Sequence, residues 1–469
     1  MQLRSPMRSR GGDVRRLLFL MSLTLILSTP VRAQQSLAPK VDSYLQPYLQ
    51  MQDFSGCVLI AKSGSTVARK CYGNANYELN VPNTPSTRFH IASVTKSFTA
   101  AAIILLEKQG KLRLTDKLSQ YIPNFPSADK ITILELLEHS SGIPSYYAIP
   151  EYDAIKFKPV GFDELIAIIR TKPLDFEPGT KSSYSDTGYA FLAYIIEKVS
   201  AKPYGRFIAD EIFTPLGMKN SGTFSDTALI PGRATGYQPW IAPITSPTGN
   251  RNADQPGQGL RIAPFYDKTI ITGSGSLYST LDDLYLFYQG MKSKRLFDIQ
   301  ALPYPYGWGV RELDGKKFIE QSGRDPGYVA RIAAFLDQDV VVIVLSNVEV
   351  AADGAIANGL EQIAFGGNPA PPPLRTIAQD KAESLAQYQG RYQIAPGSIM
   401  DIKLTGDHLF LRGPGGDYLP LEATAPGTFF FPQMYITMAF HRDDAGKIDS
   451  LLWGGDYPCK KIADQPQAN

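Results

Sequence analysis

The sequence predicts an α/β domain built on one sheet flanked by helices, followed by a small all-β domain. Strand-like sequence occurs near the start of the chain, at residues 56–72, and returns at residues 318–345. The stretch between them, above all residues 131–225, is mostly helical in pattern. Because strands stand on both sides of this helical stretch, we expect them to share one sheet, with the helices as an insertion between them. After a proline-rich break at residues 366–373, short alternating runs predict the all-β domain.

The size and composition of the chain are those of a globular protein with two domains. Its 469 residues are 43% apolar and 20% charged, and the net charge of +2 is spread along the sequence. Chains of this length usually divide into two domains or carry an appendage. An even charge distribution gives no reason to expect a nucleic-acid partner or an anionic surface.

The first 33 residues have the pattern of a secretory signal peptide. Arginines precede an apolar run at residues 17–27, and the small-residue sequence Val31-Arg32-Ala33 follows it. The alternative, a membrane anchor, is disfavoured because the apolar run is too short to span a bilayer. We therefore expect residues 1–33 to be removed. The mature protein would be exported, periplasmic or extracellular, without a stable membrane span.

Residues 56–72 predict a β-hairpin with a cysteine near each end. Cys57 and Cys71 lie symmetrically about Gly64, which stands in a Ser-Gly-Ser turn. A simple register places the two cysteines opposite each other, as a disulfide in an oxidising compartment requires. A bulge at the turn would shift that register, so two buried thiols are an equal alternative. No role is predicted for Cys459.

The remaining elements of the main domain, residues 34–366, follow in order. A helix is expected over residues 41–50. A second helix, over residues 93–106, has no polar face and is therefore expected to be buried. Further helices are expected over residues 132–139, 162–169 and 188–199. Strands are expected over residues 318–321, 330–336 and 340–345.

A linker and a second domain complete the chain. The proline-rich sequence is stiff and exposed in character, and we place the linker at residues 367–376. In the small domain, residues 377–469, apolar residues alternate at residues 400–404 and 436–440. Several short alternating strands favour an antiparallel barrel or a sandwich.

The chemical signal is a serine followed three residues later by a lysine, at the start of the buried helix. Residues i and i+3 share a face of a helix, so Lys96 is expected beside Ser93. A serine hydroxyl is a poor nucleophile until a base takes its proton. A buried lysine can lose its charge and act as that base. Backbone N–H groups at the helix start also lie near a developing oxyanion.

The same spacing occurs again at Ser127 and Lys130, where we expect no function. These residues follow Pro126 in a predicted loop, with no buried helix behind them. Serine and lysine are both abundant, so the spacing alone decides nothing.

Six segments follow the serine–lysine motif in order. They are LLEHSSGIPSY (136–146), EPGTKSSYSDTGYAFLAYIIEKVSAKPYGRFI (177–208), FTPLGMKNSGTF (213–224), GSGSLYSTLDDLYLF (273–287), YGWGV (306–310) and EQSGRDPGYVARI (320–332). This ordered set resembles the serine β-lactamase-like and penicillin-binding-protein-like hydrolases over residues 40–365. The branch it resembles contains class C β-lactamases, D-alanyl-D-alanine carboxypeptidases, D-aminopeptidases and esterases.

The resemblance implies a β-lactamase/transpeptidase-like antiparallel sheet flanked by helices, with a helical subdomain. The sequence after the linker resembles the small lipocalin-like barrel of some members, through Tyr388-Gln389-Gly390-Arg391-Tyr392. The expected architecture is therefore this α/β fold plus a small all-β barrel.

The resemblance also assigns roles to residues of this chain. Ser93 would be the nucleophile and Lys96 its proton acceptor. Tyr184, in Tyr184-Ser185-Asp186, would be the phenol that shares proton transfer with the lysine. The third motif of the family falls on Gln321-Ser322-Gly323. The backbone N–H groups of Ser93 and Arg324 would form the oxyanion hole.

Two positions depart from the family pattern. Gln321 stands where a lysine or histidine is usual, and a neutral amide is a weaker partner for a substrate carboxylate. Recognition of a β-lactam or D-alanine carboxylate is therefore expected to be weak, unless Arg324 substitutes. Asp186 stands in place of an asparagine. Its negative charge would favour the charged form of Lys96, weaken the lysine as a base, and attract a substrate amine.

Other chemistries find little support in the sequence. His139 is expected to be structural, closing a helix before Gly142. The four histidines are scattered, which argues against a zinc hydrolase, and no G-x-S-x-G motif occurs. We expect no metal and no cofactor.

The function expected from the sequence is that of an exported serine hydrolase that forms an acyl-enzyme on Ser93. The partner would be a small-molecule or peptide substrate: an ester, a D-amino-acid peptide or amide, or a β-lactam. Ester or peptide is favoured because of Gln321. The alternative is a non-catalytic binding or sensing protein that retains the fold. The oligomeric state is left open.

Overall fold

The computed structural model describes residues 36–225, 227–239, 260–350, 352–375, 382–395, 398–413, 418–432 and 434–463. The expected signal peptide, residues 1–33, lies outside the described residues. No helix within the described ranges is both long and apolar enough to cross a bilayer.

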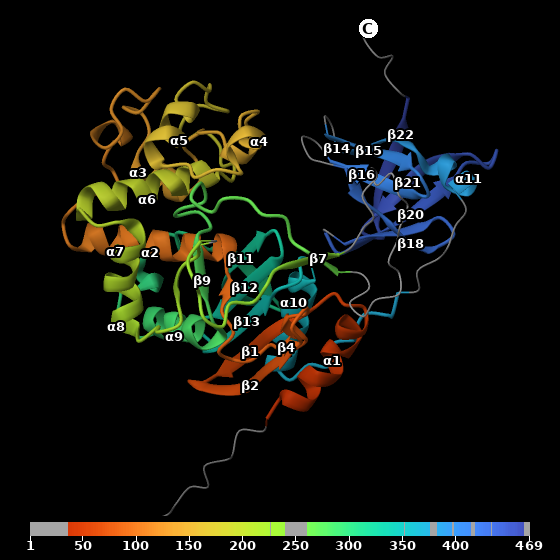
Figure 1. Ribbon diagram of the computed structural model, residues 1–469, viewed down its shortest axis with the longest axis horizontal. Coiled ribbons are helices and arrows are strands. Elements are labelled where there is room, and N and C mark those ends of the chain that lie inside the picture. The colour runs from red at the N-terminus through yellow and green to blue at the C-terminus, as the bar shows by residue number, and fades with distance from the viewer. Residues whose placement is uncertain are drawn as a thin grey trace, which may run out of the picture. The chain divides into compact units, whose positions relative to one another are not determined.

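A six-stranded antiparallel sheet forms the centre of the main domain (Figure 1). Its strand order is β10-β11-β12-β13-β1-β2. The strands are β1 (Gly56–Lys62), β2 (Ser65–Tyr72), β10 (Gly309–Leu313), β11 (Lys316–Asp325), β12 (Tyr328–Phe335) and β13 (Val340–Ser346). Strand β1 pairs along its whole length with β13, which confirms that the sheet takes strands from both ends of the segment.

Helices cover both faces of this sheet (Figure 1). Val58 and Ile60 of β1 belong to the apolar cluster of one face, whereas Leu59 belongs to the cluster of the other. This two-residue alternation is that of a strand buried on both sides. The first cluster includes residues of α1 (Ala38–Gln50) and α10 (Asp353–Ala364), and the second those of α2 (Thr95–Lys108) and α9 (Leu281–Lys292).

The helical insertion lies between β2 and β10. Its other helices are α3 (Ile133–Leu137), α4 (Tyr152–Ile155), α5 (Phe162–Ile169), α6 (Asp186–Ser200), α7 (Tyr204–Ile208) and α8 (Thr214–Leu216). Helix α2 packs against α6 and α7 (Figure 1), and every residue from Thr95 to Leu106 is buried. The prediction of a buried helix is confirmed, because a helix without a polar face needs apolar neighbours all round.

Short strands complete the main domain. They are β3 (Asn74–Asn76), β4 (Val81–Pro82), β5 (Phe89–His90), β6 (Gly222–Thr223), β7 (Tyr237–Pro239), β8 (Leu260–Ile262) and β9 (Leu277–Ser279).

The β1–β2 hairpin carries a disulfide between Cys57 and Cys71. Its turn holds two residues, so a regular register would place Cys57 opposite Lys70. Instead the pairing shifts by one residue between Ile60 and Ala61 of β1, and Cys57 lies opposite Cys71. Of the two alternatives left open by the sequence, the disulfide is therefore the one observed, and the bulge aligns the cysteines instead of separating them.

The C-terminal region forms a second, nine-stranded antiparallel sheet, ordered β17-β16-β15-β14-β22-β21-β20-β19-β18. Only Leu421 separates the two edge strands, β17 and β18, so the edges of the sheet meet and it is barrel-like. The barrel is thus favoured over the sandwich. A short helix, α11 (Ala382–Leu385), precedes it. Its strands are β14 (Gly390–Ala395), β15 (Ser398–Thr405), β16 (His408–Arg412), β17 (Leu419–Pro420), β18 (Glu422–Ala425), β19 (Thr428–Phe431), β20 (Ile436–Arg442), β21 (Ile448–Trp453) and β22 (Tyr457–Ile462).

Candidate active site

Ser93 lies at the junction between a short strand and the buried helix. Strand β5 leads into the 3-10 turn η1 (Ala92–Val94), which continues directly into α2. Ala92 has a φ of 43°, in the left-handed region that residues with a side chain disfavour. Such strain costs about 1–3 kcal/mol and persists where the surrounding structure enforces it, as at many functional sites. By contrast, Ser127 of the second serine–lysine pair lies outside any helix.

The Ser93 hydroxyl is contacted by two proton-bearing side chains. Its Oγ accepts hydrogen bonds from the Tyr184 hydroxyl at 2.9 Å and from Lys96 Nζ at 3.1 Å. The tyrosine is exposed, whereas the lysine is fully buried. The serine is therefore approached from solvent on one side and from the protein interior on the other.

The Lys96 ammonium has three hydrogen-bond acceptors. Besides Ser93, it donates to Asp186 Oδ1 at 2.7 Å and to the Ser274 carbonyl oxygen at 2.8 Å. Three acceptors match the three donors of a charged ammonium group. Burial lowers the pKa of Lys96, but the charges of Asp186 and Tyr184 raise it by more, so the net pKa lies above its ordinary value. This agrees with the expectation that Asp186 favours a charged lysine.

Helix capping places Asp186 beside the lysine. The Ser185 side chain caps α6 by accepting a hydrogen bond from the Gly188 N–H, so that Asp186 is the first residue of the helix. An acidic side chain is favoured there by the helix dipole. The carboxylate is buried, which strengthens its interaction with the lysine.

The Ser274 carbonyl is positioned by threonines of α2. Thr95 Oγ1 accepts from the Leu277 N–H at 3.1 Å, and Thr99 Oγ1 donates to the Gly273 carbonyl at 2.6 Å. These two threonines flank the lysine along the helix. They therefore hold the intervening backbone, including the Ser274 carbonyl, against the lysine ammonium.

His139 supports the ring of Tyr184. The two rings lie with their centroids 4.6 Å apart. His139 Nδ1 accepts a hydrogen bond from the Ser185 N–H at 3.1 Å, so this nitrogen carries no proton. Burial and the nearby Lys96 charge lower the pKa of His139 to about 4, so the imidazole is neutral at pH 7. His139 was expected to be structural, and its contacts make it a positioning residue for Tyr184.

Strand β11 closes the other side of the site. Gln321 Nε2 donates to the Ser93 carbonyl oxygen at 3.0 Å. Gly323 packs so closely that a Cβ built on it would lie 2.2 Å from the Ile91 carbonyl oxygen and 2.8 Å from the Ser93 nitrogen. Arg324 lies 3.7 Å from Asp353 and remains partly exposed.

These groups surround a cavity of about 340 Å³. It is lined by Ala92, Ser93, Tyr147, Tyr184, Asp186, Ile271, Ser274, Gly275, Gln321, Ser322, Arg324 and Asp325. Lys96 contacts Ser93 and Asp186, and Gly323 lies between Ser322 and Arg324 on β11, so the structure brings together the residues predicted for catalysis and substrate binding. The described residues include no group of three or more histidine, cysteine or acidic side chains that could hold a metal ion.

Sequence reasoning missed one direct contact of the site, the Ser274 carbonyl. A backbone carbonyl carries no residue-type signal, because every residue has one. The quoted segment GSGSLYS marked the region but not the atom. Sequence reasoning also gave no role to Glu138, which lines a neighbouring cavity, although this residue lies in the quoted segment LLEHSSGIPSY.

The chain is similar to known proteins both in sequence and in structure. The beta-lactamase family profile matches residues 41–364. The putative penicillin-binding protein PbpX of Bacillus subtilis (strain 168) is 30% identical over 324 residues, which cover 67% of this chain and 76% of that protein. The octameric penicillin-binding protein homologue from Pyrococcus abyssi is 27% identical, with a TM-score of 0.60 and coverage of 90% and 99% of the two chains. The D-amino acid amidase from Ochrobactrum anthropi SV3, complexed with D-phenylalanine, has a TM-score of 0.61 at 22% identity, covers 70% of this chain and 99% of its own, and shares the fold.

Proposed function

The chain belongs to the beta-lactamase family of serine hydrolases, and from this premise we propose that Ser93 is its nucleophile and forms an acyl-enzyme. The observation that carries the proposal is the convergence of Tyr184 and Lys96 on the Ser93 hydroxyl. Acyl transfer needs a nucleophile within hydrogen-bond distance of its proton acceptor. It also needs further groups that hold this acceptor in place.

Tyr184 is the proposed immediate proton acceptor, and Lys96 its electrostatic partner. The Asp186 carboxylate keeps the lysine charged, so the lysine is a poor base in this state. The lysine Nζ lies 4.7 Å from the centre of the Tyr184 ring and stabilises negative charge on the phenol oxygen. This differs from the expectation that a neutral Lys96 takes the serine proton.

In the proposed reaction, Tyr184 first loses its phenol proton to solvent, and Ser93 Oγ then attacks the substrate carbonyl carbon while its proton passes to the Tyr184 phenolate. The backbone N–H groups of Ser93 and Arg324 stabilise the oxyanion. Tyr184 then gives the proton to the leaving group as the scissile bond breaks. In the second half of the reaction, water attacks the carbonyl carbon of the acyl-serine and gives a proton to Tyr184. Tyr184 passes this proton to Ser93 Oγ as the acyl group leaves, which restores the serine hydroxyl.

We propose an ester or a D-amino-acid peptide or amide as substrate, ahead of a β-lactam. The Gln321 amide is neutral and already donates to the Ser93 carbonyl, so it offers little to a substrate carboxylate. A D-amino acid amidase is among the proteins that share this fold, which supports an amide. Export rests on the signal-like residues 1–33 and on the penicillin-binding proteins among the relatives.

The test is acylation and turnover of p-nitrophenyl acetate. We expect the intact mass of wild type to rise by one acetyl group, and Ser93→Ala to show no adduct and a rate lower by about a thousandfold. Ser127→Ala, at the second serine–lysine pair, is the matched control and should behave as wild type. If wild type is acylated neither by this ester nor by a β-lactam, the proposal fails, and the non-catalytic binding protein becomes the better account.

A further inference from the structure

A second cavity, of about 440 Å³, adjoins the one that contains Ser93. The two share Tyr184 and Gln321 in their walls, so a substrate held at the serine can extend into it. Its remaining lining residues are Leu137, Glu138, His139, Ser182, Tyr189, Tyr304, Gly307, Trp308 and Gly309.

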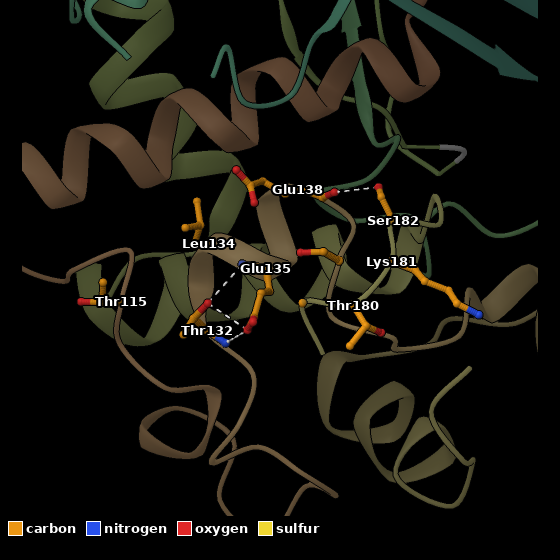
Figure 2. Close-up of a pocket in the computed structure, with 10 residues that line it drawn as sticks. Thr115, Thr132, Leu134, Glu135, Glu138, Thr180, Lys181 and Ser182 are labelled. Carbon is orange, nitrogen blue, oxygen red and sulfur yellow. Dashed lines mark hydrogen bonds between the residues drawn. The ribbon is translucent and has the colours of Figure 1, made fainter. Parts of the chain in front are cut away.

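Glu138 stands where this cavity meets a third one. Glu138 and Ser182 also line a cavity of about 620 Å³ on the other side, which Figure 2 shows. The three cavities are therefore neighbours, each sharing wall residues with the next, and Ser93 lines the first. Glu138 is the acidic residue in the lining of the middle cavity. The other lining residues are aromatic, apolar or polar without a charge, and His139 is neutral at pH 7.

The Glu138 carboxylate makes no hydrogen bond or ion pair that the described part of the chain supplies. It is the C-cap residue of α3, where a negative charge opposes the helix dipole. Burial and the neighbouring Glu135 raise the pKa of Glu138. Glu135 itself is engaged with the backbone and side chain of Thr132 in a capping box. In Figure 2 the Lys181 side chain extends away from both carboxylates.

The cavity that Glu138 lines is rich in aromatic side chains. Tyr189 and Trp308 are buried, and Tyr304 is exposed. Aromatic faces attract ammonium groups, and a partly buried carboxylate does so more strongly. A negative charge at the C-terminal end of a helix, without a cationic partner among the described residues, lowers the stability of the folded protein. Such a cost is expected at a functional site, where a ligand supplies the positive charge.

We infer that the cavity lined by Glu138 and the aromatic side chains selects substrates in which the residue on the acyl side of the scissile bond carries a primary ammonium group at the end of its side chain. This inference rests on the proposed function and specifies its substrate class. The Glu138 carboxylate binds the ammonium while the Tyr304 and Trp308 rings line its path. Glu138 acts on specificity and takes no part in proton transfer.

The test compares D-lysine p-nitroanilide with D-norleucine p-nitroanilide, which differ by the side-chain ammonium. We expect wild type to prefer the lysine compound by about tenfold in kcat/KM, the size of one charge-assisted contact. In Glu138→Gln the preference should fall to near one, mostly through KM, while the norleucine rate stays unchanged. Glu312→Gln removes an exposed carboxylate from β10 and should keep the wild-type preference.

A binding measurement separates this inference from the proposed function. Calorimetry with D-lysinamide and D-norleucinamide needs no turnover, and it should show the same preference in wild type and its loss in Glu138→Gln. Equal binding of both amides by wild type, or a preference that survives in Glu138→Gln, overturns the inference even if Ser93 is acylated. Absence of Ser93 acylation with the preference intact overturns only the proposed function. A lower melting temperature of Glu138→Gln would indicate a structural role instead.

Discussion

At the scale of single residues, the site is organised around the Lys96–Asp186 ion pair. Both side chains are buried, and the lysine reaches Ser93, Asp186 and the Ser274 carbonyl at once. A buried ion pair is held by its geometry and its further hydrogen bonds, since desolvation offsets much of the attraction. Here Asp186 favours the protonated form of Lys96, so a positive charge lies beside Ser93 in the resting state.

We predict that Asp186→Asn moves the pH dependence of kcat/KM. Removing the negative charge removes the largest of the interactions that raise the pKa of Lys96, so the Lys96–Tyr184 pair holds its protons less tightly. Because the site must give up a proton to activate Ser93, the rising limb of the profile should move to lower pH. The rate at pH 7 should increase by about tenfold.

The measurement is a pH–rate profile with p-nitrophenyl acetate. Asp163→Asn, which removes an exposed carboxylate at the start of α5, serves as the control and should leave the profile in place. A profile unchanged in Asp186→Asn would mean that Asp186 does not govern the protonation of the site.

At the scale of elements, the close fit of β11 against η1 forms the second half of the site. β11 brings Gln321 to the Ser93 carbonyl and lays Gly323 against the backbone of Ile91 and Ser93. Such an approach requires a residue without a Cβ. The glycine of the third motif is thus explained by packing.

We predict that Gly323→Ala inactivates the protein and destabilises it by about 1–3 kcal/mol. The new Cβ would lie 2.2 Å from the Ile91 carbonyl oxygen, so β11 and η1 must separate. Thermal unfolding and the acylation rate of Ser93 would be measured together. Gly309→Ala, on the neighbouring strand β10, is the matched control. Its new Cβ would come no closer than 3.7 Å to another atom, which is an ordinary contact distance. Wild-type stability and activity in Gly323→Ala would show that the approach is looser than described.

At the scale of the whole molecule, the residues of the site all come from the main domain. The cavities at Ser93 and Glu138 are lined by residues between Ala92 and Asp325. Arg375, in the segment expected to be a linker, forms hydrogen bonds of 2.6 and 2.7 Å with the buried Asp53 carboxylate. The chain up to Arg375 therefore contains every element of the proposed site.

We predict that a chain ending at Arg375 keeps p-nitrophenyl acetate turnover within about threefold of the full chain, as expected when a site is complete within one domain. Circular dichroism would first establish that the shortened chain is folded, and acylation of Ser93 would then be compared in both. Loss of acylation in a folded, shortened chain would assign the barrel-like domain a part in the active site.

Local patterns in the sequence were sufficient for the elements, whereas the candidate nucleophile also needed the resemblance of six ordered segments to a known family. The apolar helix that begins at Ser93, the hairpin at residues 56–72 and the strands on both sides of the helical segment follow from periodicities of two or 3.6 residues. These periodicities are properties of neighbouring residues. They therefore predict secondary structure and burial without knowledge of the fold.

Only the tertiary structure decided which groups meet. The contact of Lys96 with the Ser274 carbonyl depends on how residues 273–277 pack on α2, and the alignment of Cys57 with Cys71 depends on a bulge. The unpaired Glu138 carboxylate and its aromatic cavity depend on helices and loops far apart in the chain. Such contacts are set by packing between distant segments, which a pattern of neighbouring residues does not contain. The sequence by itself determined the elements and, through its motifs, pointed to Ser93 and to a charged Lys96, whereas the fold decided which groups contact these two residues and the shape of the cavities beside them.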